Sequence, residues 1–99
     1  MSADEIVLRV IRGEAPMSAL RSIGVTITAT GVVRAKAPIE TIHPTLDDLT
    51  AGLLHHRSRK SLAKWAAFVI RSEFIDIQPE RDSAGWDAIL GAVWDAAAP

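Results

Sequence analysis

The chain has 99 residues, of which 48% are hydrophobic and 23% charged, with 11 basic and 12 acidic side chains and no cysteine. This length suits one domain, and the apolar content excludes a disordered chain. No apolar run approaches the roughly 18 residues of a membrane span, and without cysteine there is no disulfide framework. From the length we expect a single domain at residues 1–99. Because Asp4 and Glu5 give the N-terminus the wrong charge for a secretory signal, we expect a cytoplasmic protein.

The first predicted element is a helical hairpin over residues 3–23. Ser2 and Glu5 have the spacing of a capping box ahead of an apolar helix face. Gly13 suits the left-handed position that ends a helix, and Pro16 suits the first turn of a second, shorter helix.

A β-hairpin is predicted over residues 25–36, where the apolar period changes from 3.6 to two. Thr30 and Gly31 supply its turn. An isolated hairpin is marginally stable in water, so Val25, Ile27 and Val33 should pack on the helices or on a partner chain. An extended connector is expected over residues 37–44.

Three helices are predicted in the segment 45–97. Thr45 and Asp48 have capping-box spacing at the start of the first of them. The second, from Ser61 to about Phe74, is apolar nearly all round, which places Trp65 in the core. Together the elements predict an α+β fold, mainly α, in which helical hairpins form a small bundle beside one β-hairpin.

The last helix should follow two residues that can cap it, Asp82 and Ser83. Its apolar stripe carries Trp86 and Trp94. A small domain has limited surface with which to cover two indoles, so the pair is either ordinary core or a hydrophobic anchor for a second chain.

Charge is separated along the second half of the chain. No acid lies between Asp48 and Glu73, whereas five lysines and arginines do. From Glu73 onward six acidic residues accompany a single arginine. The acidic residues that we predict to bind a partner are Glu73, Asp76, Glu80, Asp82 and Asp87.

The basic stretch lies at a predicted helix–turn–helix junction, which is compatible with docking on nucleic acid. The residues that would make such contacts are Arg57, Arg59, Lys60 and Lys64. However, the helix that follows lacks a polar face to read base edges, and a pI near 6.3 is far from the basic balance of such modules. A solvated turn is the favoured interpretation.

The sequence offers no pattern for catalysis, metal binding or a cofactor. His55 and His56 are adjacent and diverge on a helix, and His43 has no carboxylate at a ligand spacing. Asp47 and Asp48 are explained by helix capping. We therefore expect a chain that is not an enzyme, with no catalytic residue, no metal and no cofactor.

Two segments in the second half of the chain form a pattern that is similar to one in other proteins, and the similarity covers roughly half of the chain. The stretch from Ser58 to Ala66, which contains Trp65, is followed by Gly85 to Leu90 with the sequence GWDAIL. This order resembles a pattern in small uncharacterised bacterial helical proteins, some of them immunity-like or otherwise protein-binding. The resemblance implies a binding role and no reaction.

These features predict a protein-binding module. Its most concrete form is an immunity- or antitoxin-like inhibitor, whose acidic C-terminal surface covers the basic cleft of a toxin. The first alternative is a helix–turn–helix-like protein that binds nucleic acid through the basic stretch. The second is a structural subunit that pairs with a second copy of itself through Trp86 and Trp94.

Overall fold

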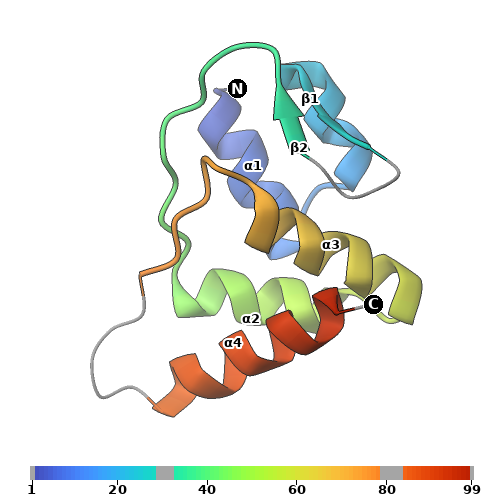
Figure 1. The fold of residues 1–99 in the computed structure, drawn as a ribbon, viewed down its shortest axis with the longest axis vertical. Coiled ribbons are helices and arrows are strands. Elements are labelled where there is room, and N and C mark those ends of the chain that lie inside the picture. Colours follow the sequence, from blue (N-terminus) through green and yellow to red (C-terminus); the bar gives the residue numbers. More distant parts are fainter. Residues whose placement is uncertain (1, 29–32, 79–83, 99) are drawn as a thin grey trace.

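The computed structural model describes residues 2–28, 33–78 and 84–98 and is mainly helical, with one antiparallel β-hairpin (Figure 1). The predicted α+β, mainly α class is confirmed. In chain order the elements are α1 (Ala3–Arg12), the 3-10 helix η1 (Met17–Ile23), β1 (Val25–Ile27), β2 (Val33–Ala35), α2 (Leu46–His55), α3 (Arg59–Arg71) and α4 (Ala84–Ala97). The hairpin and η1 lie at the opposite end of the molecule from α4 (Figure 1).

The N-terminal helices differ from the predicted pair in two details. The Ser2 side chain makes no capping bond, so the expected capping box with Glu5 is wrong. Gly13 does end α1 in the left-handed region, with φ of 80°, as predicted. Pro16 stands immediately before η1, which is a 3-10 rather than an α-helix.

The hairpin pairs Val25 with Ala35 and Ile27 with Val33. Val25 is buried and Val33 is half-buried against the core, as the alternating pattern predicts. Ile27, which pairs with Val33, remains 38% exposed, so the face expected to pack is covered only in part. The predicted turn at Thr30 and Gly31 lies outside the described residues.

The connector over residues 37–44 runs along the core, since Ile42 is buried. Its backbone forms an isolated parallel bridge with the segment that follows α3. The Ile42 N–H donates to the Phe74 carbonyl (2.7 Å), and the Asp76 N–H donates to the Ile42 carbonyl (2.9 Å). The connector is thereby fixed beside residues 74–76.

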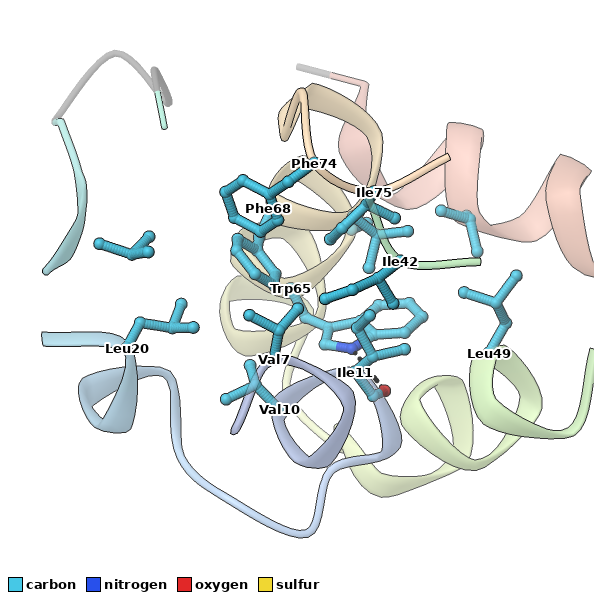
Figure 2. Packing of buried hydrophobic residues seen from close by; sticks show 14 of the residues in the cluster. Val7, Val10, Ile11, Leu20, Ile42, Leu49, Trp65, Phe68, Phe74 and Ile75 are labelled. Atoms are coloured by element: carbon cyan, nitrogen blue, oxygen red, sulfur yellow. Dashed lines mark hydrogen bonds between the residues drawn. The ribbon is translucent and has the colours of Figure 1, made fainter. Parts of the chain in front are cut away.

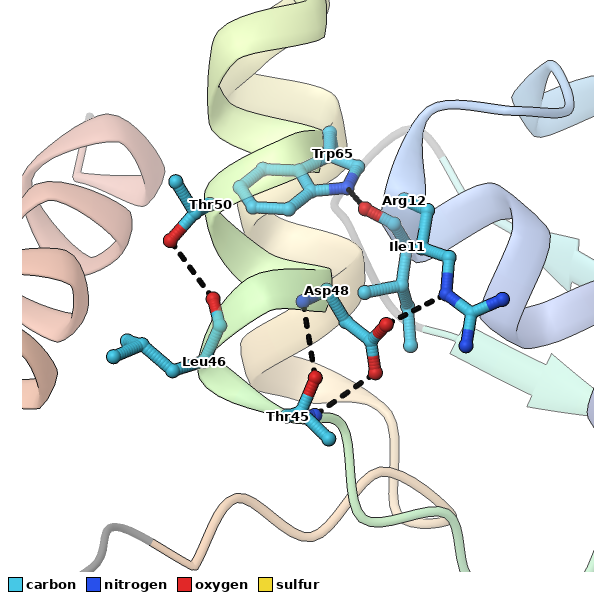
Figure 3. Close-up of polar contacts among 7 residues, drawn as sticks. All are labelled: Ile11, Arg12, Thr45, Leu46, Asp48, Thr50 and Trp65. Atoms are coloured by element: carbon cyan, nitrogen blue, oxygen red, sulfur yellow. Dashed lines mark hydrogen bonds and ion pairs between the residues drawn. The ribbon is translucent and has the colours of Figure 1, made fainter.

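The predicted capping box at the start of α2 is present (Figure 3). The Asp48 N–H donates to the Thr45 hydroxyl (3.1 Å), and the Asp48 carboxylate accepts from the Thr45 N–H (2.9 Å). The second oxygen of the same carboxylate accepts from Arg12 Nε at 2.6 Å. This ion pair ties the end of α1 to the start of α2.

Burial and hydrogen bonding act in opposite directions on Asp48. Burial raises its pKa, but the bonds from the Thr45 backbone, the Arg12 guanidinium and the Thr45 hydroxyl together bring the pKa below its ordinary value. The carboxylate is therefore held in its ionised form between the two helices.

At the centre of the core, Trp65 of α3 is 0% exposed (Figure 2), as predicted. Its indole N–H donates to the Ile11 carbonyl at the end of α1, at 2.9 Å. The helix that carries it begins at Arg59, earlier than predicted, because the Ser58 hydroxyl accepts from the Ser61 N–H. It ends at Arg71 rather than near Phe74.

Space for this hydrogen bond depends on Gly52 in α2. A Cβ at this position would lie 2.1 Å from the Ile11 carbonyl oxygen and 2.4 Å from the Trp65 ring. Any side chain at residue 52 would therefore displace either the indole or the backbone of α1.

Candidate docking surface on the last helix

The last helix, α4, packs against α3 and α2 with only one side. Trp86 and Val93 are buried there, and Ile89 and Leu90 are half-buried. The exposed side is made mostly of small residues, with two carboxylates and one indole; its members are Gly85, Asp87, Ala88, Gly91, Ala92, Trp94 and Asp95. A helix with this little charge on its outer side resembles one that a further element covers.

The two tryptophans of α4 have different surroundings. Trp86 is 5% exposed and belongs to the core, whereas Trp94 is 62% exposed. Eight residues of α-helix turn the second side chain by about 80° from the first, which carries it past the buried stripe. Of the predicted pair, Trp94 alone offers its ring at the surface.

An apolar hollow of about 260 Å³ lies beside Trp94. It is formed by the C-terminal part of α3, the segment after that helix and α4; its lining residues are Val69, Ile70, Ile75, Ile77, Leu90, Val93 and Trp94. We refer to it as the α3–α4 hollow. Because Ile75 is held by the backbone bridge to Ile42, one wall of the hollow is fixed by the connector.

Three of the predicted acidic residues, Glu73, Asp76 and Asp87, are exposed. Asp76 stands between two residues that line the hollow, and its carboxylate accepts from the Gln78 amide at 3.0 Å. The same carboxylate lies 3.7 Å from His43 Nδ1. The other two predicted acids, Glu80 and Asp82, lie outside the described residues, as does Ser83.

The predicted basic residues surround the start of α3. Arg57, Arg59, Lys60 and Lys64 are all exposed. A second, open hollow of about 280 Å³ is lined there by Met17, Ser58, Lys60, Ser61 and Lys64. The helix itself turns a broad apolar side inward and buries Trp65, Ala66, Phe68 and Val69.

A histidine–serine contact in the turn between α2 and α3 was not evident in the sequence. His56 Nδ1 lies 2.5 Å from the Ser61 hydroxyl, and the His56 ring is tilted against Trp65 with centroids 5.7 Å apart. His56 Nε2 is buried without a hydrogen-bond partner among the described residues. Burial, and then the charge of His55, lower the pKa of His56.

No carboxylate orients this histidine in the described part of the chain, because its second ring nitrogen has no partner there. The contact therefore differs from a nucleophile–base–acid arrangement, in which a third group bonds the free nitrogen of the histidine. Within residues 2–28, 33–78 and 84–98, no group of three histidine or acidic side chains is placed to hold a metal ion. The same ranges contain no helix of the length and apolarity that crossing a bilayer requires.

Comparison of the chain with protein-family models, with curated proteins and with solved structures found no match.

Proposed function

We propose that this chain is a protein-binding module that docks a basic partner protein on α4 and the α3–α4 hollow. The observation that carries the proposal is the position of Trp94, which is exposed at the edge of an apolar hollow. From Glu73 onward, in the part of the chain that supplies most of this surface, six acidic residues accompany one arginine. An apolar anchor within an acidic surface is complementary to a partner with an apolar side chain among cations.

The two features would act on different steps of binding. Long-range attraction between the carboxylates and a basic partner raises the association rate. Burial of an indole and of the apolar lining then slows dissociation, and tryptophan is enriched among the residues that dominate interface energies. Asp76 and Asp87 would thus contribute mainly to the rate of encounter and Trp94 to the lifetime of the complex.

In its most specific form, the proposal is an immunity- or antitoxin-like inhibitor in the bacterial cytoplasm. Such a protein would cover the basic cleft of a toxin, for example a nuclease, with its acidic surface. The resemblance of residues 58–66 and 85–90 to small bacterial helical proteins supports this form.

Charge reversal and removal of the anchor test the proposal separately. One variant carries Glu73→Lys, Asp76→Lys and Asp87→Lys, and another carries Trp94→Ala. A partner captured from lysate with the native chain is identified, and its association and dissociation rates are measured at two salt concentrations. The reversal should slow association by about tenfold or more at low salt, and Trp94→Ala should weaken binding by about 2 kcal/mol, mainly through faster dissociation.

The matched control is Leu54→Ala, because Leu54 is a large apolar residue, 77% exposed, on α2. It should leave both rates unchanged. If the native chain and both variants capture the same proteins with the same rates, the α4 surface does not bind the partner.

A second candidate function is favoured by the hollow at the start of α3, where Lys60 and Lys64 stand with two serine hydroxyls. These groups can contact phosphate, as in a helix–turn–helix-like protein that binds nucleic acid. The candidate is weaker because a pI near 6.3 is far from the basic balance of nucleic-acid-binding modules, although Lys60, Lys64 and Arg71 are exposed on α3. The dimerising subunit also remains an alternative, with Trp94 rather than the Trp86–Trp94 pair at its surface.

A further inference from the structure

We propose that the element docking on α4 is a cationic amphipathic helix of the partner, an inference that rests on the protein-binding function proposed above. It names the shape of the occupant, its apolar anchor and the spacing of its charges. Each of these follows from a different feature of α4.

The shape follows from the small residues on the outer side of α4. Ala88, Gly91 and Ala92 are exposed, and a Cβ at Gly91 would meet nothing within 4 Å. Two helices approach to about 8–10 Å between their axes, and the nearer distances need small side chains at the contact. The 14 residues of α4 present about 21 Å of such a surface, enough for several turns of a second helix.

The anchor follows from the α3–α4 hollow, which lies beside the small residues on the outer side of α4. Leu90 and Trp94 stand one turn apart on α4, and both line the hollow. Apolar side chains on one face of a docked helix would enter the hollow and cover the exposed indole, as in other helix-in-groove complexes.

The charge follows from Asp87 and Asp95, the only charged residues of α4. They lie eight residues apart, or about 12 Å along the axis, one on either side of Gly91. A helix crossing near Gly91 meets both carboxylates if it carries lysine or arginine residues about seven or eight positions apart. Its apolar residues then lie between its cations.

A second copy of this chain fits the same surface poorly. In an antiparallel pair of α4 helices with its twofold axis at Gly91, Asp87 of each chain would face Asp95 of the other, because the two residues are equally spaced about Gly91. Like charges directly opposed destabilise an interface.

The experiment uses a labelled synthetic peptide of about 18 residues, long enough to span α4. It carries leucines on one helical face and lysines seven residues apart on the flanks, without tryptophan. A peptide of the same composition, with the leucines distributed around the helix, is the matched ligand control. Binding to the full chain is followed by the anisotropy of the label and by the tryptophan fluorescence of the chain, to which the exposed Trp94 contributes together with the buried Trp65 and Trp86.

Two variants examine the contact. Gly91→Gln introduces a residue that favours helix but places a long side chain on the outer side of α4. It should weaken peptide binding by about tenfold or more. Asp87→Asn with Asp95→Asn should weaken it by a similar factor and remove most of its salt dependence. Leu54→Ala should bind as the native chain does. Circular dichroism of each variant verifies that the helices are retained.

Binding of the patterned peptide, with loss in both variants and none in Leu54→Ala, supports the proposal. Equal binding of the two peptides, or full binding to Gly91→Gln, overturns it. If sedimentation equilibrium shows that the native chain is a dimer and that the Gly91→Gln variant is a monomer, the occupant is a second copy of the chain. This result also overturns the proposal. If the partner captured by the native chain still depends on Trp94 while Gly91→Gln binds it normally, the helical occupant is wrong but the protein-binding function stands.

Discussion

Gly52 and Gly91 are both helix-interior glycines, and their surroundings predict opposite effects for the same substitution. Gly52→Ala would push a methyl group into the Ile11 carbonyl and the Trp65 ring, whereas Gly91→Ala would place it in open space. The first should lower the free energy of unfolding by about 2 kcal/mol or more, since overpacking costs more than alanine gains. The second should raise it by about 0.5–1 kcal/mol, because alanine favours helix.

Urea titration of the two variants measures both effects, and each serves as the control for the other. A loss below about 0.5 kcal/mol for Gly52→Ala would mean that the close approach of Trp65 to α2 is incorrect.

His56 gives the fold a dependence on pH near neutrality. Because burial and then the charge of His55 lower the pKa of His56 from its ordinary 6.5, the unfolded chain takes up a proton at a pH where the folded chain does not. Neutral His56 therefore contributes fully to the free energy of unfolding above pH 6.5, and this contribution is lost as the pH falls from 6.5 through the lowered pKa of the folded chain. Urea titrations of the native chain and of His56→Gln between pH 7.5 and 5 should show a smaller decline in the variant. Parallel declines would contradict this account.

At the scale of elements, the start of α2 combines two stabilising roles in Asp48. Thr45→Ala removes one capping bond and should cost about 1 kcal/mol. Asp48→Ala removes the other half of the capping box and also leaves Arg12 without the carboxylate 2.6 Å away. We expect Asp48→Ala to lower the free energy of unfolding more than Thr45→Ala does. Arg12→Ala should lower it little further when Asp48→Ala is already present, because the partner of the guanidinium is then absent. A double-mutant cycle by urea unfolding measures this coupling. Additive effects would mean that the ion pair between Arg12 and Asp48 does not stabilise the contact between α1 and α2.

Elements with local signals were predictable from the sequence, and contacts between elements were not. The spacing of Thr45 and Asp48 encodes a cap within four residues, but nothing local indicates that Arg12, 36 positions away, bonds the same carboxylate. Likewise, helical periodicity placed Trp94 on the apolar stripe of α4 together with Trp86. Its exposure depends on how far α2 and α3 extend over that helix, which periodicity does not contain.

The same distinction applies to the candidate site. The acidic composition after Glu73 was readable, because charge is a property of the sequence alone. The α3–α4 hollow was not, because Val69, Ile75 and Leu90 come from three segments that meet only in the folded chain. Trp86 and Trp94 fall on one apolar stripe in the sequence pattern, although the helix turns Trp94 about 80° away from Trp86 and beyond the buried residues.

For the whole molecule, the separation of charge predicts how the chain treats polyanions. The 11 basic and 12 acidic side chains nearly cancel, and in the described part of the chain only four of the cations, Arg57, Arg59, Lys60 and Lys64, cluster near the start of α3. We expect duplex DNA to bind weakly, without sequence preference, and to dissociate as salt approaches physiological concentration. Fluorescence anisotropy across a salt series measures this. A salt-resistant, sequence-dependent complex abolished by Arg57→Ala with Arg59→Ala would favour the nucleic-acid alternative.

The backbone bridge between Ile42 and Ile75 closes a loop of chain that contains both α2 and α3. Loop closure costs conformational entropy, so the bridge should form after the helices inside the loop. The amide protons of Ile42 and Asp76, which make its two bonds, then exchange with solvent whenever the loop opens locally. A partner helix seated in the hollow beside Ile75 would keep the loop closed and slow exchange at Ile42, a residue that does not line the hollow.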